Sequence, residues 1–253
     1  MKRLQDNVTI ITGGGKGIGF GLASAFAKEG SNLVITGRNE ARLLEAKKKL
    51  EEGYGVKVLA LVADGADEVK IKEVIAKTVD TFGKINTLIN NAQTSKSGLS
   101  LIEHTKEDFD LAINSGLYAT FFYMKEAFPY LKESKGSVIN FASGAGLFGK
   151  LGQSSYAAAK EGIRGLSRVA AAEWGPDGVR VNIIAPLAMT ESLTEWKEAY
   201  PELFAKTIQG IPLGRFADPM QDIGRVAVFL ASDDASYLTG ETITLQGGSG
   251  LRP

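Results

Sequence analysis

Short runs of apolar, mostly β-branched residues alternate with longer helix-like segments along the whole of this 253-residue chain. Several runs are nearly continuous in apolar residues, as expected for strands covered on both faces. Strict alternation of strand and helix implies right-handed crossovers and a parallel sheet. We therefore predict a doubly wound α/β fold with a seven-stranded parallel sheet and helices on both faces. The expected strands are residues 7–12, 32–36, 56–62, 85–90, 136–142, 179–185 and 241–246, and the expected helices are residues 17–30, 40–52, 67–82, 105–133, 154–174 and 219–232.

One segment departs from this alternation. Residues 187–215 form a long insertion after the sixth expected strand. It sits at the carboxyl end of a strand, where open α/β sheets bind ligands, and long connections in compact domains often serve as lids. We expect a substrate loop or lid here, with one or two short helices that turn Leu193, Trp196, Leu203, Phe204 and Ile208 inward. With no linker or repeat in the sequence, residues 1–253 are expected to form a single domain that binds a dinucleotide and carries out catalysis.

Composition excludes several kinds of function. The 29 basic and 29 acidic residues give a formal net charge of +0, which argues against a nucleic-acid or membrane partner. The absence of cysteine excludes disulfides and thiolate metal sites, and His104 is the single histidine, so no metal site is expected. We interpret His104 as a surface or capping residue. No apolar stretch approaches the ~18 residues of a transmembrane helix, so a cytoplasmic location is expected.

Glycines stand directly between the first expected strand and the first expected helix. Gly13, Gly17 and Gly19 have the spacing G-x-x-x-G-x-G. Such a turn brings the backbone close to a pyrophosphate, and the following helix offers free N–H groups and a favourable dipole. No G-x-x-x-x-G-K-[ST] pattern fits this stretch, so the loop favours a dinucleotide over a nucleoside triphosphate.

The end of the second strand indicates which dinucleotide is bound. A carboxylate about 20 residues beyond the glycine loop would bind the ribose hydroxyls of NAD. Here Arg38 stands instead, and Glu40 is expected to belong to the next helix, capped by Asn39. A guanidinium suits a 2′-phosphate, and Lys16 adds a second positive charge. We therefore predict NADP(H) as the cofactor.

A tyrosine and a lysine share one face of the alanine-rich helix 154–174. Of the seven tyrosines, only Tyr156 has a lysine, Lys160, four residues later. Residues at this spacing are neighbours on a helix. A nearby ammonium, like the positive nicotinamide of an oxidised cofactor, would stabilise a phenolate, so we expect the two together to lower the pKa of Tyr156.

The chain resembles the short-chain dehydrogenase/reductase family, in its compact cytosolic form, over essentially all of its length. The matching stretches are TGGGKGIG (12–19), NNA (90–92), INSG (113–116), SVINFASGAG (137–146), YAAAK (156–160), VRVNIIAP (179–186), FLASDDASYLTGE (229–241) and the glycines 247–248. The resemblance implies a Rossmann-like domain, a nicotinamide cofactor and a homo-tetramer or dimer. The subunit contact expected from it uses helices 105–133 and 154–174.

The resemblance also implies roles for individual residues. Tyr156 would be the general acid/base, Lys160 its helper and a ligand of the nicotinamide ribose, Ser143 the group that binds the substrate oxygen, and Asn114 the holder of a water in the proton relay. The cofactor would contact Gly13, Lys16, Gly17, Ile18, Gly19, Arg38, Asp64, Asn90, Ala92, Tyr156, Lys160, Pro186 and Thr190.

Three positions depart from the family pattern. Gln93 and Leu187 stand where the family commonly has glycine, and Thr190 lies one position nearer to Pro186 than in many relatives. We interpret these differences as changes in the shape of the substrate pocket. The residues expected to contact the substrate are Gln93, Ser143, Leu187, Met189, Leu193 and Trp196.

The prediction is therefore an NADP(H)-dependent enzyme that interconverts a ketone and a secondary alcohol. The apolar residues after Pro186 favour an apolar or alicyclic, steroid-like small molecule. An alternative is reduction of a 3-oxoacyl thioester, for which Lys96 and Lys150 would receive a phosphopantetheine arm. A non-catalytic NADP-binding sensor is a further alternative, but it would be expected to lack Ser143, Tyr156 or Lys160.

Overall fold

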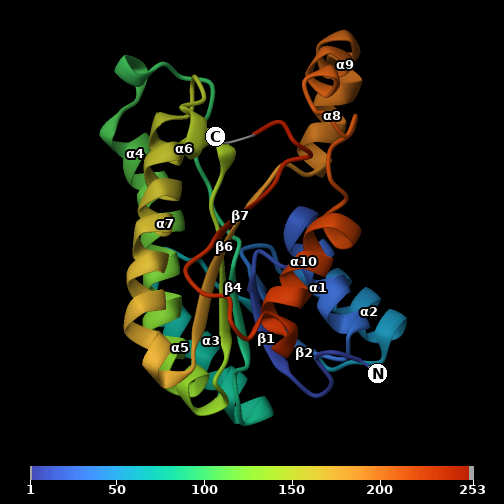
Figure 1. The fold of residues 1–253 in the computed structure, drawn as a ribbon, viewed down its shortest axis with the longest axis vertical. Helices are drawn as coiled ribbons and strands as arrows, with labels where there is room; N and C mark the ends of the chain where they lie inside the picture. The colour runs from blue at the N-terminus through green and yellow to red at the C-terminus, as the bar shows by residue number, and fades with distance from the viewer. Residues whose placement is uncertain (1, 251–253) are drawn as a thin grey trace.

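A parallel sheet of seven strands runs through the middle of the molecule (Figure 1), in a computed structural model that describes residues 2–250 apart from the side chain of Ser192. The strand order is β3-β2-β1-β4-β5-β6-β7, and every neighbouring pair is parallel. This confirms the predicted doubly wound α/β fold, and each strand lies within two residues of its expected bounds. The strands are β1 (Val8–Thr12), β2 (Asn32–Gly37), β3 (Val58–Val62), β4 (Thr87–Asn90), β5 (Ser137–Phe141), β6 (Arg180–Pro186) and β7 (Thr242–Leu245).

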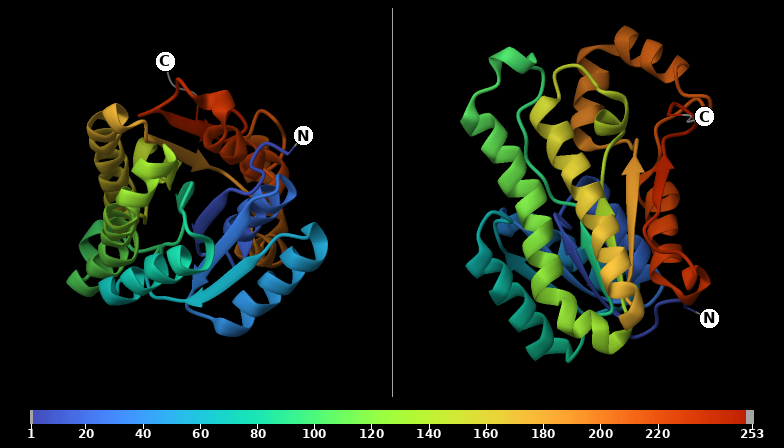
Figure 2. Two further views of the ribbon diagram at one scale, coloured as in Figure 1. Left: turned by 90° about the horizontal axis from the view of Figure 1, so that it is seen from below. Right: turned by 60° about the vertical axis from the view of Figure 1, so that its left-hand side comes forward.

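Helices cover both faces of the sheet (Figure 2). One face carries α1 (Gly17–Lys28), α2 (Glu40–Tyr54) and α10 (Arg225–Ala231), and the other carries α3 (Glu68–Phe82), α5 (Ala119–Ser134) and α7 (Ser154–Trp174). Successive strand residues point to opposite faces, so Ile10 joins one hydrophobic core and Ile11 the other. This is why the strands are apolar at almost every position.

Capping residues in the sequence determine where the helices begin and end. The Asn39 side chain accepts a hydrogen bond from Arg42 N–H at 2.9 Å, as expected for the cap of α2. The same helix ends at Gly55, whose φ of 69° lies in the left-handed region that glycine adopts readily.

The expected helix 105–133 is one long rod with an irregular centre. It consists of α4 (Lys106–Ala112), a π-helical stretch at Ile113–Tyr118, and α5. Wide turns of this kind are rare and frequently lie at functional sites. Asn114 belongs to the wide turn, which packs against α7.

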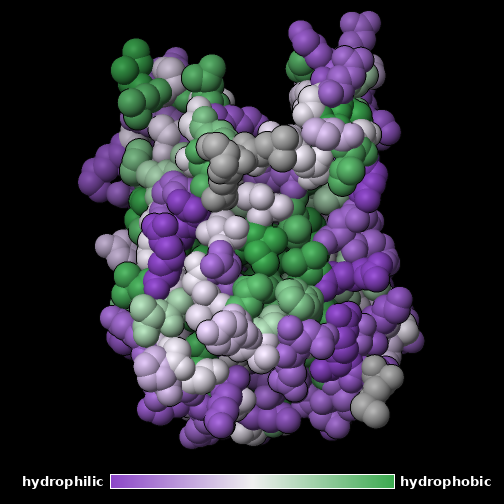
Figure 3. Space-filling view, in the orientation of Figure 1, coloured by the Kyte–Doolittle hydropathy of each residue, from purple (hydrophilic) through white to green (hydrophobic). Residues whose placement is uncertain are grey.

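The insertion after β6 contains two short helices, as predicted: α8 (Glu191–Ala199) and α9 (Pro201–Gln209). They rise beyond the carboxyl end of the sheet, opposite α4 and the short α6 (Gly144–Phe148), and the surface is hollowed between the two groups (Figures 1 and 3). The expectation for Leu203 was wrong, because its side chain is 52% exposed. Phe204, one residue later, takes the inward position, and Leu203, about 100° further around the helix, falls on the solvent side.

Two searches of residues 2–250 gave negative results. No helix there is long and apolar enough to cross a membrane. In the same range, no group of three or more acidic, histidine or cysteine side chains is arranged to hold a metal ion.

Candidate active site

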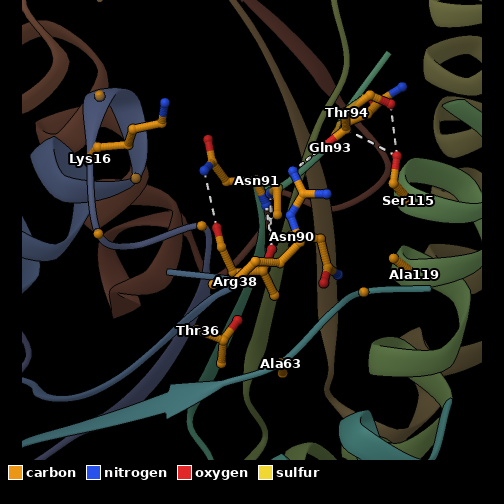
Figure 4. Close-up of a pocket in the computed structure, with 18 of the residues that line it drawn as sticks. Lys16, Thr36, Arg38, Ala63, Asn90, Asn91, Gln93, Thr94, Ser115 and Ala119 are labelled. Atoms are coloured by element: carbon orange, nitrogen blue, oxygen red, sulfur yellow. Dashed lines mark hydrogen bonds between the residues drawn. The ribbon is translucent and has the colours of Figure 1, made fainter. Parts of the chain in front are cut away.

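A pocket of about 500 Å³ opens at the carboxyl ends of the strands, where the chain crosses from β1 to β2 on one side and β4 lies on the other. Ligands bind at this reversal of strand order in open α/β sheets. Its walls come from the glycine loop, the end of β2, the segment after β4 and the start of α8 (Figure 4). The predicted cofactor residues Gly13, Lys16, Gly17, Ile18, Gly19, Arg38, Asp64, Asn90, Ala92 and Thr190 all line it.

The glycine loop can be built only from glycine at its key positions. Gly13 and Gly17 have φ values of 70° and 53°, which other residues adopt only with strain. A Cβ on Gly19 would lie 2.0 Å from the carbonyl oxygen of Gly13. The loop is therefore packed on itself, and its outer side is left open toward the pocket. This cradle and the amino end of α1 fit the pyrophosphate of a dinucleotide.

Partly buried hydrogen bonds fix the loop against the segment after β4. The Thr12 hydroxyl accepts hydrogen bonds from the backbone N–H groups of Asn91 and Ala92, both at 3.0 Å. The Asn91 side chain donates to the Thr12 carbonyl at 3.0 Å. Sequence reasoning missed Thr12, although a hydroxyl that ends an apolar strand just before the glycines was a usable signal.

Arg38 extends across the pocket mouth (Figure 4). Its guanidinium Nη2 donates to the Thr94 hydroxyl at 3.0 Å, so most of its donors stay available. In the part of the chain that the structure describes, neither Arg38 nor Lys16 forms an ion pair. Asp64, by contrast, accepts a hydrogen bond from Ala66 N–H at 3.0 Å in the turn after β3.

Gln93 contributes an amide without partners. Both polar atoms of its side chain are buried and form no hydrogen bond. The amide lies against Gly116 in the π-helical stretch, where a Cβ would come within 2.7 Å of Cδ of Gln93. Buried polar groups are normally hydrogen-bonded, so this amide is free to bind a ligand or a water in the pocket.

Three of the predicted catalytic groups, Ser143, Tyr156 and Lys160, lie together near the carboxyl end of β5, outside the lining of the pocket, and the fourth, Asn114, belongs to the wide turn that packs against α7. Ser143 follows β5, and its hydroxyl accepts a hydrogen bond from Ala145 N–H at 3.1 Å as the cap of α6. Tyr156 lies in the first turn of α7, and the Ser143 side chain is near enough to its hydroxyl to lower the pKa of Tyr156. One turn later, the Lys160 ammonium lies 5.6 Å from the Tyr156 ring centroid and donates to the Phe141 carbonyl at 2.7 Å.

Burial dominates the ionisation of both groups. It raises the pKa of Tyr156, and the Ser143 hydrogen bond opposes this effect. It lowers the pKa of Lys160 to about 7, because the ammonium has lost its water. In the protein alone the expected lowering of the Tyr156 pKa by Lys160 is not found, and the part assigned to the oxidised nicotinamide stays a prediction. The ammonium is itself easily deprotonated, and it lies 5.6 Å from the centroid of the Tyr156 ring.

The chain after β6 combines a rigid start with an apolar cluster. Beyond Pro186, the Leu187 carbonyl accepts from Ala217 N–H at 3.0 Å, and Met189 N–H donates to the Ala217 carbonyl at 2.9 Å. Thr190 caps α8 by accepting from Leu193 N–H at 3.4 Å. The predicted substrate residues Leu187, Met189, Leu193 and Trp196 pack, partly exposed, around a core of Phe204, Ile211 and Phe216.

Two other polar residues near the site were not anticipated in these positions. His104 is half-buried, and its Nδ1 lies 3.0 Å from the Ser154 hydroxyl, so it joins the segment before α4 to the start of α7. Glu191 lines the pocket and accepts a hydrogen bond from Gly17 N–H at 3.3 Å. The sequence shows Glu191 directly after the predicted cofactor residue Thr190, but its contact with Gly17 depends on how residues 187–215 fold back onto the glycine loop.

Comparison with known proteins agrees with this arrangement. Residues 13–249 match the family model described as enoyl-(acyl carrier protein) reductase. A 12alpha-hydroxysteroid dehydrogenase from Clostridium sp. (strain ATCC 29733 / VPI C48-50) is 61% identical over 252 residues, which are 97% of each chain. A 3-oxoacyl-(acyl-carrier-protein) reductase from Thermotoga maritima is 38% identical over 97% of this chain and 98% of its own.

Solved structures give the same result. The crystal structure of levodione reductase superimposes with a TM-score of 0.92 at 33% identity, covering 98% of this chain and 99% of the other. The agreement therefore extends over the whole sheet and its helices.

Proposed function

This chain belongs to the short-chain dehydrogenase/reductase family, and from that premise we propose that it is an NADP(H)-dependent enzyme that interconverts the 12α-hydroxyl and 12-oxo forms of a steroid. The chain is an oxidoreductase that acts on CH–OH groups with a nicotinamide cofactor. The observation that carries the proposed chemistry is the contact of Tyr156 with Ser143 above the buried Lys160, beside the glycine-loop pocket.

Proton transfer is the part of the reaction assigned to the protein. The nicotinamide, when bound, supplies or accepts the hydride. In the direction of reduction, the Tyr156 hydroxyl gives its proton to the substrate oxygen, and the Ser143 hydroxyl donates a hydrogen bond to the same oxygen as negative charge develops. Oxidation of the alcohol runs these proton movements in reverse.

Lys160 is assigned the return of the proton to Tyr156. A pKa of about 7 allows its amine to gain and lose a proton near neutral pH at little cost. Its hydrogen bond to the Phe141 carbonyl holds Nζ in place below the ring. Asn114, in the wide turn that packs against α7, is proposed to hold the water that links Lys160 to solvent.

NADP(H) rather than NAD(H) is supported by the charge at the pocket mouth. Arg38 directly follows β2 with its guanidinium unpaired by any carboxylate among the described residues, and Lys16 also lines the pocket. We expect Arg38→Asp to lower the ratio of NADPH to NADH efficiency (kcat/KM) by at least about tenfold, because a 2′-phosphate would meet a carboxylate. An unchanged ratio would remove Arg38 from this role.

A steroid substrate is supported by the relative that is 61% identical and by the apolar side chains beside the site. The 3-oxoacyl thioester alternative has weaker support, because the 3-oxoacyl-(acyl-carrier-protein) reductase from Thermotoga maritima is 38% identical to this chain, against 61% for the hydroxysteroid dehydrogenase. The sensor alternative is disfavoured because Ser143, Tyr156 and Lys160 are present and in contact.

The test is NADPH consumption with steroids that carry a single oxo group at C3, C7, C12 or C17, beside a 3-oxoacyl thioester. The proposal requires kcat/KM for the 12-oxo steroid to exceed that of every other compound. Preference for the thioester would support the alternative, and cofactor binding without turnover of any compound would indicate a sensor.

A further inference from the structure

Glu191 places a negative charge at the amino end of α1. It is the first residue of α8, in the insertion after β6, and lies 174 residues from Gly17 in the sequence. Its Oε1 nevertheless accepts a hydrogen bond from the Gly17 N–H at 3.3 Å, and Oε2 lies 3.9 Å from the position of a Cβ on that glycine.

The amino end of α1 has little else to satisfy it. The first turn of this twelve-residue helix holds no acidic residue, and Lys16, its cap, makes no side-chain hydrogen bond to the helix. Helix amino ends carry unpaired N–H groups and a partial positive charge. The Glu191 carboxylate therefore lies between two such ends, that of α1 and that of α8, its own helix.

The same N–H groups are those a dinucleotide's pyrophosphate needs. Two negative groups cannot share one donor, and at about 4 Å their repulsion is about 1 kcal/mol even in water. We propose that Glu191 acts as a stand-in anion: it occupies the phosphate-binding turn when the cofactor is absent, and the pyrophosphate displaces it. This inference rests on the proposed function only in taking the pocket to be a dinucleotide site.

Displacement of Glu191 would move α8. The chain just before the helix is held by the two backbone hydrogen bonds between residues 187–189 and Ala217. The Glu191 carboxylate makes the hydrogen bond between the start of α8 and the glycine loop, beside the Thr190 methyl group, which lies 3.8 Å from the position of a Cβ on Gly17. Release of Glu191 would leave only the apolar contact of Thr190 at this point, so the helix could pivot about residues 187–189. Leu193 and Trp196 lie on α8, and cofactor binding would therefore reposition the side chains expected to contact the substrate.

The charge of Glu191 is tested with inorganic pyrophosphate and with NADP⁺, by calorimetry and without turnover. Glu191→Gln keeps an oxygen that can accept from Gly17 but removes the charge. We expect it to bind both ligands about three- to tenfold more tightly than the parent chain at low salt, with the gain shrinking at high salt. Glu195→Gln is the matched control, because Glu195 is an exposed carboxylate one turn further along α8 and should leave both affinities unchanged.

The movement of α8 is tested by fluorescence. The chain has two tryptophans, and Trp174 packs against Phe128 at a ring distance of 4.6 Å, far along α7. A Trp174→Phe background leaves Trp196 as a reporter on α8. Pyrophosphate should change its emission in this background, and Glu191→Ala, which removes the contact with Gly17, should show the changed emission in the same background before any ligand is added.

The outcomes of these experiments decide between the proposal for Glu191 and its rejection. Equal affinities of Glu191→Gln and Glu195→Gln for pyrophosphate would overturn the proposal, and so would a Trp196 emission that neither pyrophosphate nor Glu191→Ala alters. Failure of every form to bind NADP⁺ would overturn both this inference and the proposed function. Tight binding of NADP⁺ with no steroid turnover would leave the stand-in anion supported and the proposed substrate rejected.

Discussion

At the scale of single residues, Lys160 is the one lysine, arginine, aspartate or glutamate that is buried among the residues the structure describes. Only 4% of it is exposed, and the Phe141 carbonyl is the partner of its ammonium. One neutral acceptor replaces only part of the lost hydration, so the charged form is held at a cost. A surface lysine would be charged at all physiological pH values. The burial is what brings the proton affinity of this amine into the range where the proposed relay operates.

The cost of burying Lys160 predicts a pH-dependent stability. Its pKa of about 7 in the folded chain lies below the ordinary 10.5, so between these values the unfolded chain binds the extra proton. The stability of the parent chain therefore rises with pH across this window through this group. Relative to the parent, Lys160→Met should gain roughly 1.4 kcal/mol in unfolding free energy per pH unit lowered from about 9.5 to about 7.5, and no more below about 7.

Urea denaturation of the protein without cofactor measures this difference. Lys77→Met, which alters an exposed lysine on α3, should show no such slope because its side chain is in water in both states. A pH-independent difference for Lys160→Met would mean that the ammonium is not desolvated as its burial indicates.

Tyr156 gives a second prediction at this scale. Tyr156→Phe removes the hydroxyl that meets Ser143 but keeps the ring that packs over Lys160. We expect kcat to fall by about 10²–10⁴ while the Kd for NADPH changes less than about twofold, because general acid–base catalysis contributes on that order. Tyr237→Phe, at a fully exposed tyrosine, is the control and should retain full turnover. Comparable turnover by Tyr156→Phe would exclude the tyrosine as the proton donor.

At the scale of elements, each helix beside the site begins at a point that is fixed by the residues just before it. The start of α1 depends on how tightly the glycine loop closes, that of α6 on Ser143, and that of α8 on Thr190. The wide turn between α4 and α5 gives Asn114 a position that a regular helix would not. Chemistry at this edge of the sheet therefore depends on element ends rather than on element interiors.

The glycine loop can be tested with a pair of alanine substitutions. Gly19→Ala would place Cβ 2.0 Å from the Gly13 carbonyl oxygen, so the backbone must shift. We expect a loss of roughly 1–3 kcal/mol in unfolding free energy and a loss of NADPH binding. Gly53→Ala, in α2 with no atom within 4 Å of its Cβ, should instead gain up to about 1 kcal/mol and keep its affinity. Unimpaired NADPH binding by Gly19→Ala would show that the loop is not the phosphate cradle.

At the scale of the whole molecule, local sequence patterns predicted most of the architecture. The strands and the sheet followed from apolar runs, and α7 from its alanine-rich period, because these depend on neighbours in the sequence. The interruption of helix 105–133 and the outward side of Leu203 did not follow, since helical periodicity does not record a wide turn or which of two adjacent apolar residues faces in. Local patterns also could not predict the pKa of Tyr156, because burial controls it, or the contact between Glu191 and Gly17, because the two residues are far apart in the sequence.

One face of the molecule is more apolar than a surface in water needs to be. The neighbouring helices α5 and α7 lie side by side (Figure 2), and the outward residues Tyr118, Phe121 and Val169 on or just before them are 40–55% exposed. Leu111, on α4, extends the same rod. Apolar patches of this kind mark interaction sites, and a second copy of the chain would cover this one with its own equivalent helices.

A homo-oligomer formed through this face predicts the effect of a single charge. Val169→Glu adds a carboxylate to the exposed side of α7, where it would be buried against its symmetry mate, so we expect a dimer or tetramer to become a smaller species. Light scattering coupled to size-exclusion chromatography measures the mass. Val69→Glu alters a valine of similar exposure at the start of α3, where a carboxylate suits the helix end, and should leave the assembly intact. The same mass for both variants and the parent would place the subunit contact elsewhere, since glutamate is tolerated on an exposed helix face but not at the centre of an apolar interface.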